Sequence, residues 1–174
     1  MIYDPTSLNI KDKIDSLLPI WKTEFLENTP DISDAPLYDI GKNLDVHKKW
    51  KMLVVKIMEE WDEENTMRYP LFTSFIKSLG EDCRGAGFSI LEPGGNVLPH
   101  TDTEEDQDKY IIVHAPLIVP EGDIGFTEGN EKGKWVEGDT FILDVLTKHS
   151  IWNNTDKPRV VILLELSKEK FLCK

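Results

Sequence analysis

The chain has 174 residues, of which 40% are hydrophobic and 30% are charged, and these values favour one folded domain over a disordered chain. Its 32 acidic and 20 basic residues give a formal net charge of −12, which argues against a main role in binding nucleic acid or an anionic membrane surface. There are only two cysteines, no basic-then-apolar signal segment and no long apolar stretch. We therefore expect a cytoplasmic protein without a membrane anchor.

The N-terminal part is expected to begin with a helix. Apolar residues recur at three- and four-residue steps from Ile10 to Phe25, which places them on one helical face. Pro19 interrupts this face, so the pattern predicts either two short helices or one kinked helix. The polar, proline-containing segment 29–36 is typical of a loop.

Residues 50–57 fit either a strand or a helix, because their β-branched content favours a strand while their length and flanks allow a helix. A further helix is expected over 66–79, with Pro70 near its start and Gly80 at its C-terminal end. The first 80 residues should thus form a largely helical part.

The second half of the chain is expected to form strands. The β-prone runs are short and cover residues 86–91, 110–119, 139–145 and 159–166. Turn signals separate them at residues 92–96, 121–123, 129–130 and 153–156. The order predicts an α+β single domain over 1–174, in which helices of residues 1–80 pack on a compact β core of residues 81–174 that carries the site.

Three of the four histidines lie in this β-rich half. His100 and Asp102 are two residues apart, so on an extended chain their side chains point to the same side. His149 lies downstream and can approach from a neighbouring strand. Two imidazoles and one carboxylate on one face form the triad of non-haem Fe(II) oxygenases, which leaves coordination positions open for substrates.

Arg159 opens a strongly apolar run, so its guanidinium must reach the rim of the sheet or bind a carboxylate. Paired with an internal Asp or Glu it would be structural. Pointing into the same cavity as a metal, it would bind the distal carboxylate of a 2-oxo diacid. The residues alone leave both interpretations open.

Two stretches carry a family resemblance. Residues 87–100 (GFSILEPGGNVLPH) resemble the first signature of the aspartyl/asparaginyl β-hydroxylase family. Its second signature is similar to the elements at 135–139, 141–144 and 149–153, followed by Arg159. Order, spacing and residue type agree over 86–166, whereas residues 1–45 match nothing that we can name.

The resemblance implies a double-stranded β-helix (a cupin-like jelly roll) that binds Fe(II) and the co-substrate 2-oxoglutarate and uses O2. His100 and His149 match the two iron-binding histidines of the family. Arg159 falls where the family places the arginine that pairs with the 2-oxoglutarate carboxylate. Ser89 and His114 match a serine and a histidine that also contact the co-substrate.

Two positions depart from the family pattern. Some members, including animal enzymes that act on secreted domains, have glycine at the position of Asp102 and bind iron with two histidines only. We favour a ligand role for Asp102 over an outward position in the acidic run that includes Glu104 and Glu105. At Ile112 those animal enzymes carry an arginine that helps to hold an acidic substrate, so an aspartate side chain as substrate is in doubt here.

Four further residues have less specific interpretations. Trp50 and Trp135 are expected in the core, because the chain lacks the basic groove that nucleic acid requires. Trp152 lies three residues after His149 and is a candidate for the border of the substrate pocket. Asp144 either orients His149 or caps a turn.

The predicted function is that of a 2-oxoglutarate-dependent dioxygenase, with His100, Asp102 and His149 as metal ligands. It would hydroxylate an unactivated C–H bond of an amino acid, free or within a peptide or protein, and release succinate and CO2. The alternatives are a cupin-like Zn or Mn hydrolase or isomerase and a non-catalytic domain that binds a small acid. The sequence predicts no nucleic-acid or membrane partner and does not indicate an oligomeric state.

Overall fold

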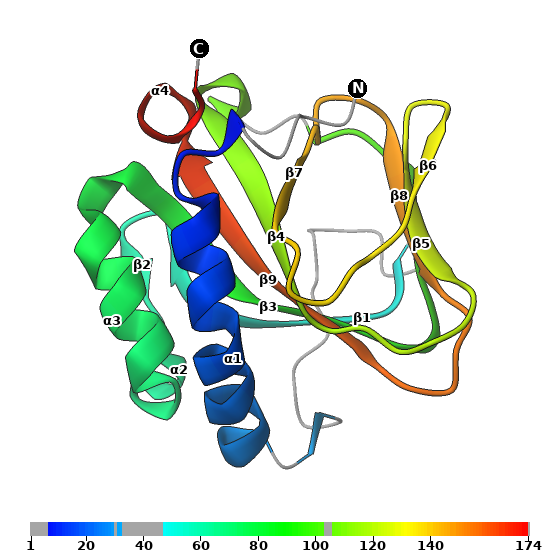
Figure 1. Ribbon diagram of the computed structural model, residues 1–174, viewed down its shortest axis with the longest axis horizontal. Coiled ribbons are helices and arrows are strands. Elements are labelled where there is room, and N and C mark those ends of the chain that lie inside the picture. The colour runs from blue at the N-terminus through cyan, green and yellow to red at the C-terminus, as the bar shows by residue number, and fades with distance from the viewer. Residues whose placement is uncertain (1–6, 30, 33–46, 103–105, 174) are drawn as a thin grey trace.

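The computed structural model describes residues 7–29, 31–32, 47–102 and 106–173, and Figure 1 shows a curled sheet with helices along one side. Most of the expected loop at 29–36, and Glu104 and Glu105 of the acidic run, lie outside the described residues. Within the described part of the chain, no helix has the length and apolar character needed to cross a membrane.

The longest helix confirms the first helical prediction. Helix α1 (Lys11–Asn28) runs through Pro19 as one element and buries Ile14, Leu18 and Phe25. The face predicted from the three- and four-residue steps is therefore the face that packs on the sheet.

The prediction of a single helix over 66–79 is wrong in one respect. The structure has α2 (Glu63–Arg68) and α3 (Pro70–Leu79), separated at Tyr69, whose φ of −122° and ψ of 65° are not helical. A residue that precedes proline is disfavoured in the α conformation, which explains the break. Gly80 ends α3 with a φ of 62°, as the stop signal predicted. The remaining short elements are η3 (Gly80–Asp82), η4 (Gln107–Lys109) and α4 (Lys168–Phe171).

Strands make up most of the rest of the chain, and every pair is antiparallel. They are β1 (His47–Ile57), β2 (Glu60–Trp61), β3 (Cys83–His100), β4 (Tyr110–Ile118), β5 (Ile124–Glu128), β6 (Glu131–Gly133), β7 (Phe141–Leu143), β8 (His149–Asn153) and β9 (Arg159–Ser167). The order is β6-β5-β8-β3-β9-β4-β7, with β1 paired to β3 and β2 to β1. The ambiguous segment 50–57 is thus a strand. It belongs to the sheet, although it lies in the part of the chain that was predicted to be largely helical.

Strand β3 corrects the turn predicted at 92–96. Its first half pairs with β9 up to Leu91 and its second half pairs with β8 from Gly95 onward, while β1 pairs with both halves. Between them, Gly94 has a φ of 69°, so the strand bends without reversing. Because one strand passes from one half of the sheet to the other, the sheet curls into the predicted double-stranded β-helix with N-terminal helices.

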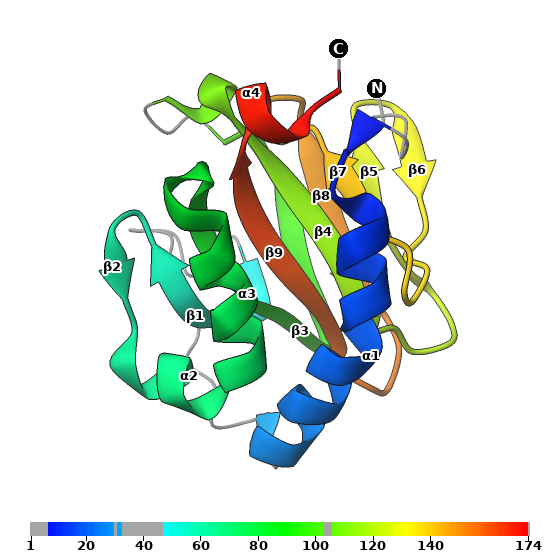
Figure 2. The same cartoon turned by 60° about the vertical axis from the view of Figure 1, so that its left-hand side comes forward.

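The sheet has apolar residues on both faces. On β9, Val160, Ile162 and Leu164 belong to the core beneath the helices, whereas Val161 and Leu163 belong to the core inside the curled sheet. Figure 2 shows α1 and α3 across the face formed by β4 and β9. Gly87 allows β1 to approach β3 closely, since a Cβ there would lie 2.6 Å from the carbonyl oxygen of Leu53.

Candidate metal centre and its pocket

Three possible metal ligands meet where β3 and β8 lie side by side. His100 at the end of β3 is directly opposite His149 at the start of β8, and their ring centroids are 4.3 Å apart. Asp102 follows β3, and its Oδ1 lies 3.3 Å from Nε2 of His100. One ligand atom from each of the three residues lies within 4.8 Å of the others. Among the described residues, this is the group of His, Cys, Asp and Glu side chains that can hold a metal ion.

Backbone contacts orient both imidazoles. Nδ1 of His100 lies 2.8 Å from the carbonyl oxygen of Leu98, and Nδ1 of His149 lies 3.0 Å from that of Thr147. A carbonyl oxygen only accepts, so Nδ1 carries the proton in both rings and Nε2 is available as the ligand atom. Metal-binding histidines are commonly fixed in this way.

The two histidines have opposite pKa shifts. The hydrogen bond that the protonated ring donates to Asp102 raises the pKa of His100, because the carboxylate stabilises a positive charge on the ring. Burial lowers the pKa of His149, because the charged ring would lose its hydration. Asp102 thus supplies a carboxylate that attracts a cation, and His149 supplies an imidazole that is kept neutral. This combination suits a divalent first-row metal.

The turn before His149 is held by Asp144, which answers the question that the sequence left open. Its carboxylate accepts hydrogen bonds from the Leu146 amide at 3.2 Å and from Oγ1 of Thr147 at 2.9 Å. The carbonyl of Thr147 in turn accepts from His149. Asp144 therefore caps the turn and, through that turn, orients His149. The buried Glu128, which the sequence analysis did not identify, accepts from the Asp144 amide at 3.0 Å.

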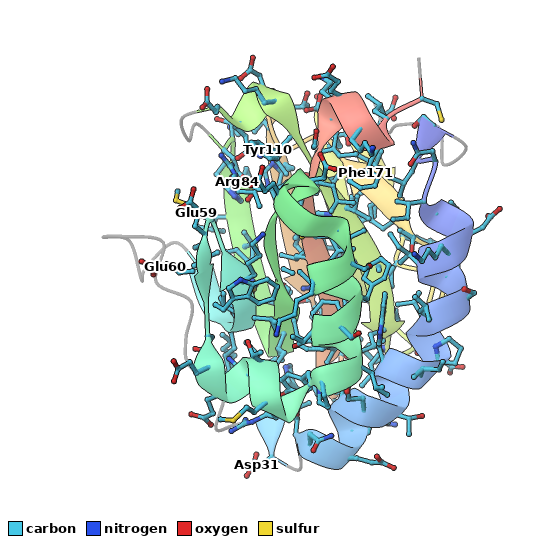
Figure 3. The ribbon with its side chains drawn as sticks, turned by 90° about the vertical axis from the view of Figure 1, so that its left-hand side faces the viewer. Asp31, Glu59, Glu60, Arg84, Tyr110 and Phe171 are labelled. Carbon is cyan, nitrogen blue, oxygen red and sulfur yellow. The ribbon has the colours of Figure 1, made fainter. Side chains whose placement is uncertain are left out.

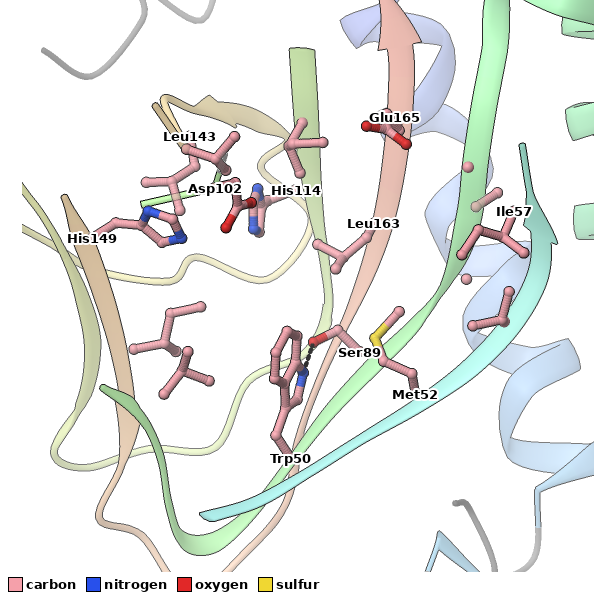
Figure 4. A pocket seen from close by; sticks show the side chains of 18 of the residues that line it. Trp50, Met52, Ile57, Ser89, Asp102, His114, Leu143, His149, Leu163 and Glu165 are labelled. Carbon is pink, nitrogen blue, oxygen red and sulfur yellow. Dashed lines mark hydrogen bonds between the residues drawn. The ribbon is translucent and has the colours of Figure 1, made fainter. Parts of the chain in front are cut away.

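Arg159 and Ser89 are joined inside the curled sheet. The Arg159 side chain is 1% exposed, and its Nη2 donates to Oγ of Ser89 at 3.0 Å. Trp50 donates to the same oxygen from β1 at 2.9 Å, an interaction that the sequence analysis missed (Figure 4). Neither Nε nor Nη1 of Arg159 has a hydrogen-bond partner within the described chain. No internal carboxylate is bonded to this guanidinium among those residues, so the structural alternative for Arg159 has no support.

Aromatic rings surround Arg159 and His114. The guanidinium carbon of Arg159 lies 4.6 Å from the centroid of Trp135, a cation–π contact that gives this expected core residue a second role. His114 stacks on Phe141 with the centroids 5.5 Å apart. Burial lowers the pKa of His114 to about 3 and that of Arg159 to about 9, so at neutral pH the imidazole is uncharged and the guanidinium is charged.

The metal-site residues lie in the wall of a pocket of ≈ 180 Å³. His100, Asp102, His149, Ser89 and His114 all line it, whereas Arg159 lies behind Ser89. The rest of the wall is mainly apolar and comes from β1, β3, β4, β7, β8, β9 and the turn after β7: Trp50, Met52, Val54, Ala86, Val97, Ile112, Leu143, Val145, Ile151 and Leu163. Figure 4 shows Trp50 and Ser89 below the metal-site residues and Glu165 on the far side of Leu163.

Ile112 and Trp152, both singled out from the sequence, differ in their position relative to this wall. Ile112, at the position of the substrate-binding arginine in some animal enzymes, lines the pocket. Trp152 is not among the lining residues, and its Nε1 instead donates to Asp123 at 2.8 Å. The prediction for Trp152 is wrong because alternate residues of β8 face opposite sides, and His149 and Ile151 occupy the inner side.

Solved structures with a similar arrangement include a predicted oxalate decarboxylase from Thermotoga maritima. The similarity to it has a TM-score of 0.48 at 16% identity and covers 79% of this chain and 96% of that one. A cupin-2 domain from Rhodospirillum rubrum gives a TM-score of 0.48 at 9% identity, over 76% of this chain and 68% of that one.

Sequence comparison finds relatives named as hydroxylases. An ornithine lipid ester-linked acyl 2-hydroxylase of Rhizobium tropici is 26% identical over 96% of this chain and 60% of its own length. The aspartyl/asparaginyl beta-hydroxylase of Homo sapiens is 27% identical over 45% of this chain and 10% of its own length. The chain thus spans less than two thirds of the length of either relative. The profile of the aspartyl/asparaginyl beta-hydroxylase family matches residues 9–169, and the chain belongs to this family.

Proposed function

We propose that the protein is an Fe(II)- and 2-oxoglutarate-dependent hydroxylase. The observation that supports this most is the placement of Arg159. It is a fully buried cation, bonded to a residue that lines the same pocket as His100, Asp102 and His149, and two of its nitrogens lack partners within the described chain. A buried charge without a counter-ion is costly, so an anionic ligand is the expected partner.

The side chains of the site fit both Fe(II) and 2-oxoglutarate. Two imidazole nitrogens and one carboxylate oxygen match the two-histidine, one-carboxylate set of non-haem iron enzymes and leave room for further ligands. The free nitrogens of Arg159 match a carboxylate, which accepts two parallel hydrogen bonds from a guanidinium.

In this proposal His100, Asp102 and His149 hold the metal, and their backbone contacts keep both Nε2 atoms directed at it. Iron, when bound, supplies the activation of O2 that side chains cannot provide. Arg159 binds the far carboxylate of 2-oxoglutarate. Ser89 already accepts hydrogen bonds from Trp50 and Arg159, so its own proton is available to donate to the same carboxylate.

The apolar wall excludes water from the reaction. The substrate C–H bond, 2-oxoglutarate and O2 become the hydroxylated product, succinate and CO2, with one oxygen atom of O2 in the alcohol and the other in succinate. His114 next to Arg159 is neutral, so it adds no second positive charge that would draw the co-substrate carboxylate away from Arg159.

We propose an amino acid, free or within a peptide, as the substrate. The pocket of ≈ 180 Å³ is smaller than typical pockets for drug-sized ligands, so it suits a side chain or a small molecule. An acyl chain is a second candidate, because most of the wall is apolar and the relative from Rhizobium tropici is named for acyl hydroxylation.

The decisive experiment is an anaerobic titration. Fe(II) is added to the metal-free protein, and 2-oxoglutarate is then titrated while the visible spectrum is recorded. We expect a weak charge-transfer band that is absent in His149→Ala and that requires at least tenfold more 2-oxoglutarate in Arg159→Ala.

Asp123→Asn is a suitable control, because Asp123 bonds Trp152 on the outer side of β8. It should titrate like the unchanged protein. If the folded, iron-loaded protein gives no band, the oxygenase proposal is wrong. Binding of Zn(II) or Mn(II) without the band would then favour a cupin-like hydrolase or isomerase, and binding of a small acid without metal would favour a non-catalytic domain.

A further inference from the structure

A second polar group lines the pocket away from the metal-site residues. Gln107, on the turn η4, is 4% exposed. Its Oε1 accepts a hydrogen bond from Nη2 of Arg84 at 3.1 Å, which fixes the orientation of the amide. Its Nε2 has no hydrogen-bond partner in the part of the chain that the structure describes. A buried donor without a partner costs free energy, so a ligand acceptor is the expected partner.

Glu165 on β9 lines the same end of the pocket. Its Oε1 forms an ion pair with Nη2 of Arg84, the same nitrogen that donates to Gln107. The other oxygen, Oε2, lies over Gly85, where an added Cβ would be only 3.1 Å away. One guanidinium therefore holds the amide donor of Gln107 and the carboxylate of Glu165 close to each other.

Arg84 is itself held in place. Its guanidinium carbon lies 4.1 Å from the ring centroid of Tyr110, and Figure 3 shows the two residues together above the end of α3. Gln107 on η4 and Glu165 on β9 are thus held by Arg84 of β3, which itself packs on Tyr110 of β4.

Apolar side chains separate this pair from the metal site. Leu163 lies between His149 and Glu165 in Figure 4. Ile112 and Val54 line the same wall. A ligand that spans the pocket therefore needs an aliphatic part near the metal and a polar part at the far end.

The polar part must accept one hydrogen bond and donate another. An alkyl chain would leave Gln107 without a partner, and a lone carboxylate would lie against Glu165. The backbone of an amino acid supplies both functions, as the C=O and N–H of a peptide or as the carboxylate and ammonium of the free amino acid. Its acceptor would receive the Gln107 proton and its donor would bond to Glu165.

We propose that Gln107 and Glu165 form a subsite for the backbone of an amino acid whose aliphatic side chain extends toward the metal. This rests on the function proposed above and specifies its substrate class. It separates the two candidate substrates, because an acyl chain leaves the subsite unused. Ile112 in the wall is consistent with an aliphatic side chain in place of an acidic one.

The test is a binding experiment on the full chain loaded with Zn(II), which replaces iron without turnover, and with saturating 2-oxoglutarate. The side-chain NH2 resonances of Gln107 are observed by ¹⁵N NMR. The probes are L-valine, L-leucine, L-isoleucine and L-proline, each free and as its N-acetyl N-methylamide, with octanoate as the acyl probe.

We expect at least one amino-acid probe to shift the Gln107 resonances saturably and octanoate to leave them unchanged. The free and capped forms distinguish a free amino acid from a peptide. Affinity for that probe, measured by calorimetry, should fall at least tenfold in Gln107→Met and in Gln107→Glu, which keeps the acceptor for Arg84 but loses the donor. Affinity for 2-oxoglutarate should stay within twofold. Asp108→Asn, an exposed neighbour in η4, is the matched control and should bind like the unchanged protein.

The subsite is refuted if no amino-acid probe shifts Gln107, if Gln107→Met binds the probe unchanged, or if octanoate shifts the resonances equally. Failure of 2-oxoglutarate to bind is a different result, since it contradicts the proposed function. The probes are therefore also titrated without 2-oxoglutarate, so that the subsite is tested in either case.

Discussion

Glu24 provides a sharp test of how the helices support the sheet. It lies on α1 and is 5% exposed, and its two carboxylate oxygens accept hydrogen bonds from the first turn of α3. The distances are 2.6 Å from the amide of Leu71 and 2.9 Å from that of Phe72. The N-cap residue of α3, Tyr69, makes no capping hydrogen bond with its side chain. Glu24 therefore caps α3 from another helix.

The expected magnitude follows from these two contacts. A hydrogen bond to a charged group contributes about 1.5–3 kcal/mol, and the carboxylate also interacts favourably with the positive end of the helix. Glu24→Leu leaves two buried N–H groups without an acceptor, so we expect a loss of about 3–5 kcal/mol of unfolding free energy. Glu24→Gln keeps one acceptor oxygen and should lose about 1.5–3 kcal/mol.

Urea unfolding followed by far-UV circular dichroism measures these differences. Glu27→Gln on the same helix is the control, because Glu27 is exposed, and its change should stay within about 0.5 kcal/mol. Hydrogen exchange locates the effect, since the Leu71 and Phe72 amides should lose protection first. A Glu24→Gln protein as stable as the control would refute the capping role.

Three further predictions follow from buried groups. His114 has a pKa of about 3 in the fold and an ordinary value of 6.5, so below pH 6.5 the unfolded chain binds one more proton than the folded one. Lowering the pH from 6.5 to 5 should therefore remove about 2 kcal/mol of stability measured by urea unfolding, and His114→Phe should lose this dependence. At pH 8 Ellman's reagent should react with the exposed Cys173 only. Cys83, buried and with its pKa raised to about 12, should react after unfolding, and a native count of two thiols would contradict this. Gly87→Ala should cost about 1–3 kcal/mol in thermal or urea unfolding, because its Cβ would collide with the Leu53 carbonyl; an unchanged midpoint would show that β1 can move away freely.

Elements with a strong local pattern were predictable from the sequence. Helix α1 repeats its apolar residues at helical spacing, and β4 and β9 are rich in β-branched residues. The short strands β5 and β6 were missed, because their residues carry little local preference and are ordered by pairing with distant strands.

The candidate site was predictable in part, where its residues are close together in the sequence. The spacing of His100 and Asp102 indicates a shared direction, and the structure brings both to His149. The support for Ser89 by Trp50 spans 39 residues, so it depends on the pairing of β1 with β3 and has no local signal. Gln107 follows an acidic run whose composition indicates a solvated segment, and only the fold reveals that this one side chain is buried.

The bend in β3 explains how Ser89 and His100, predicted on either side of a turn, come to line the same pocket. Ser89 and His100 are on the same strand, eleven residues apart, and a straight strand would separate them by about 36 Å. Both nevertheless line one pocket of ≈ 180 Å³. The proline and glycines at 93–95 do produce a left-handed residue, Gly94, as a turn signal predicts. The chain direction is nevertheless kept, because β1 pairs with β3 on both sides of the bend while the other neighbour changes from β9 to β8. A bend at this position is what allows one strand to contribute both the serine next to Arg159 and a histidine of the metal site, so the segment that was misread as a turn is the part of the fold on which the proposed chemistry depends.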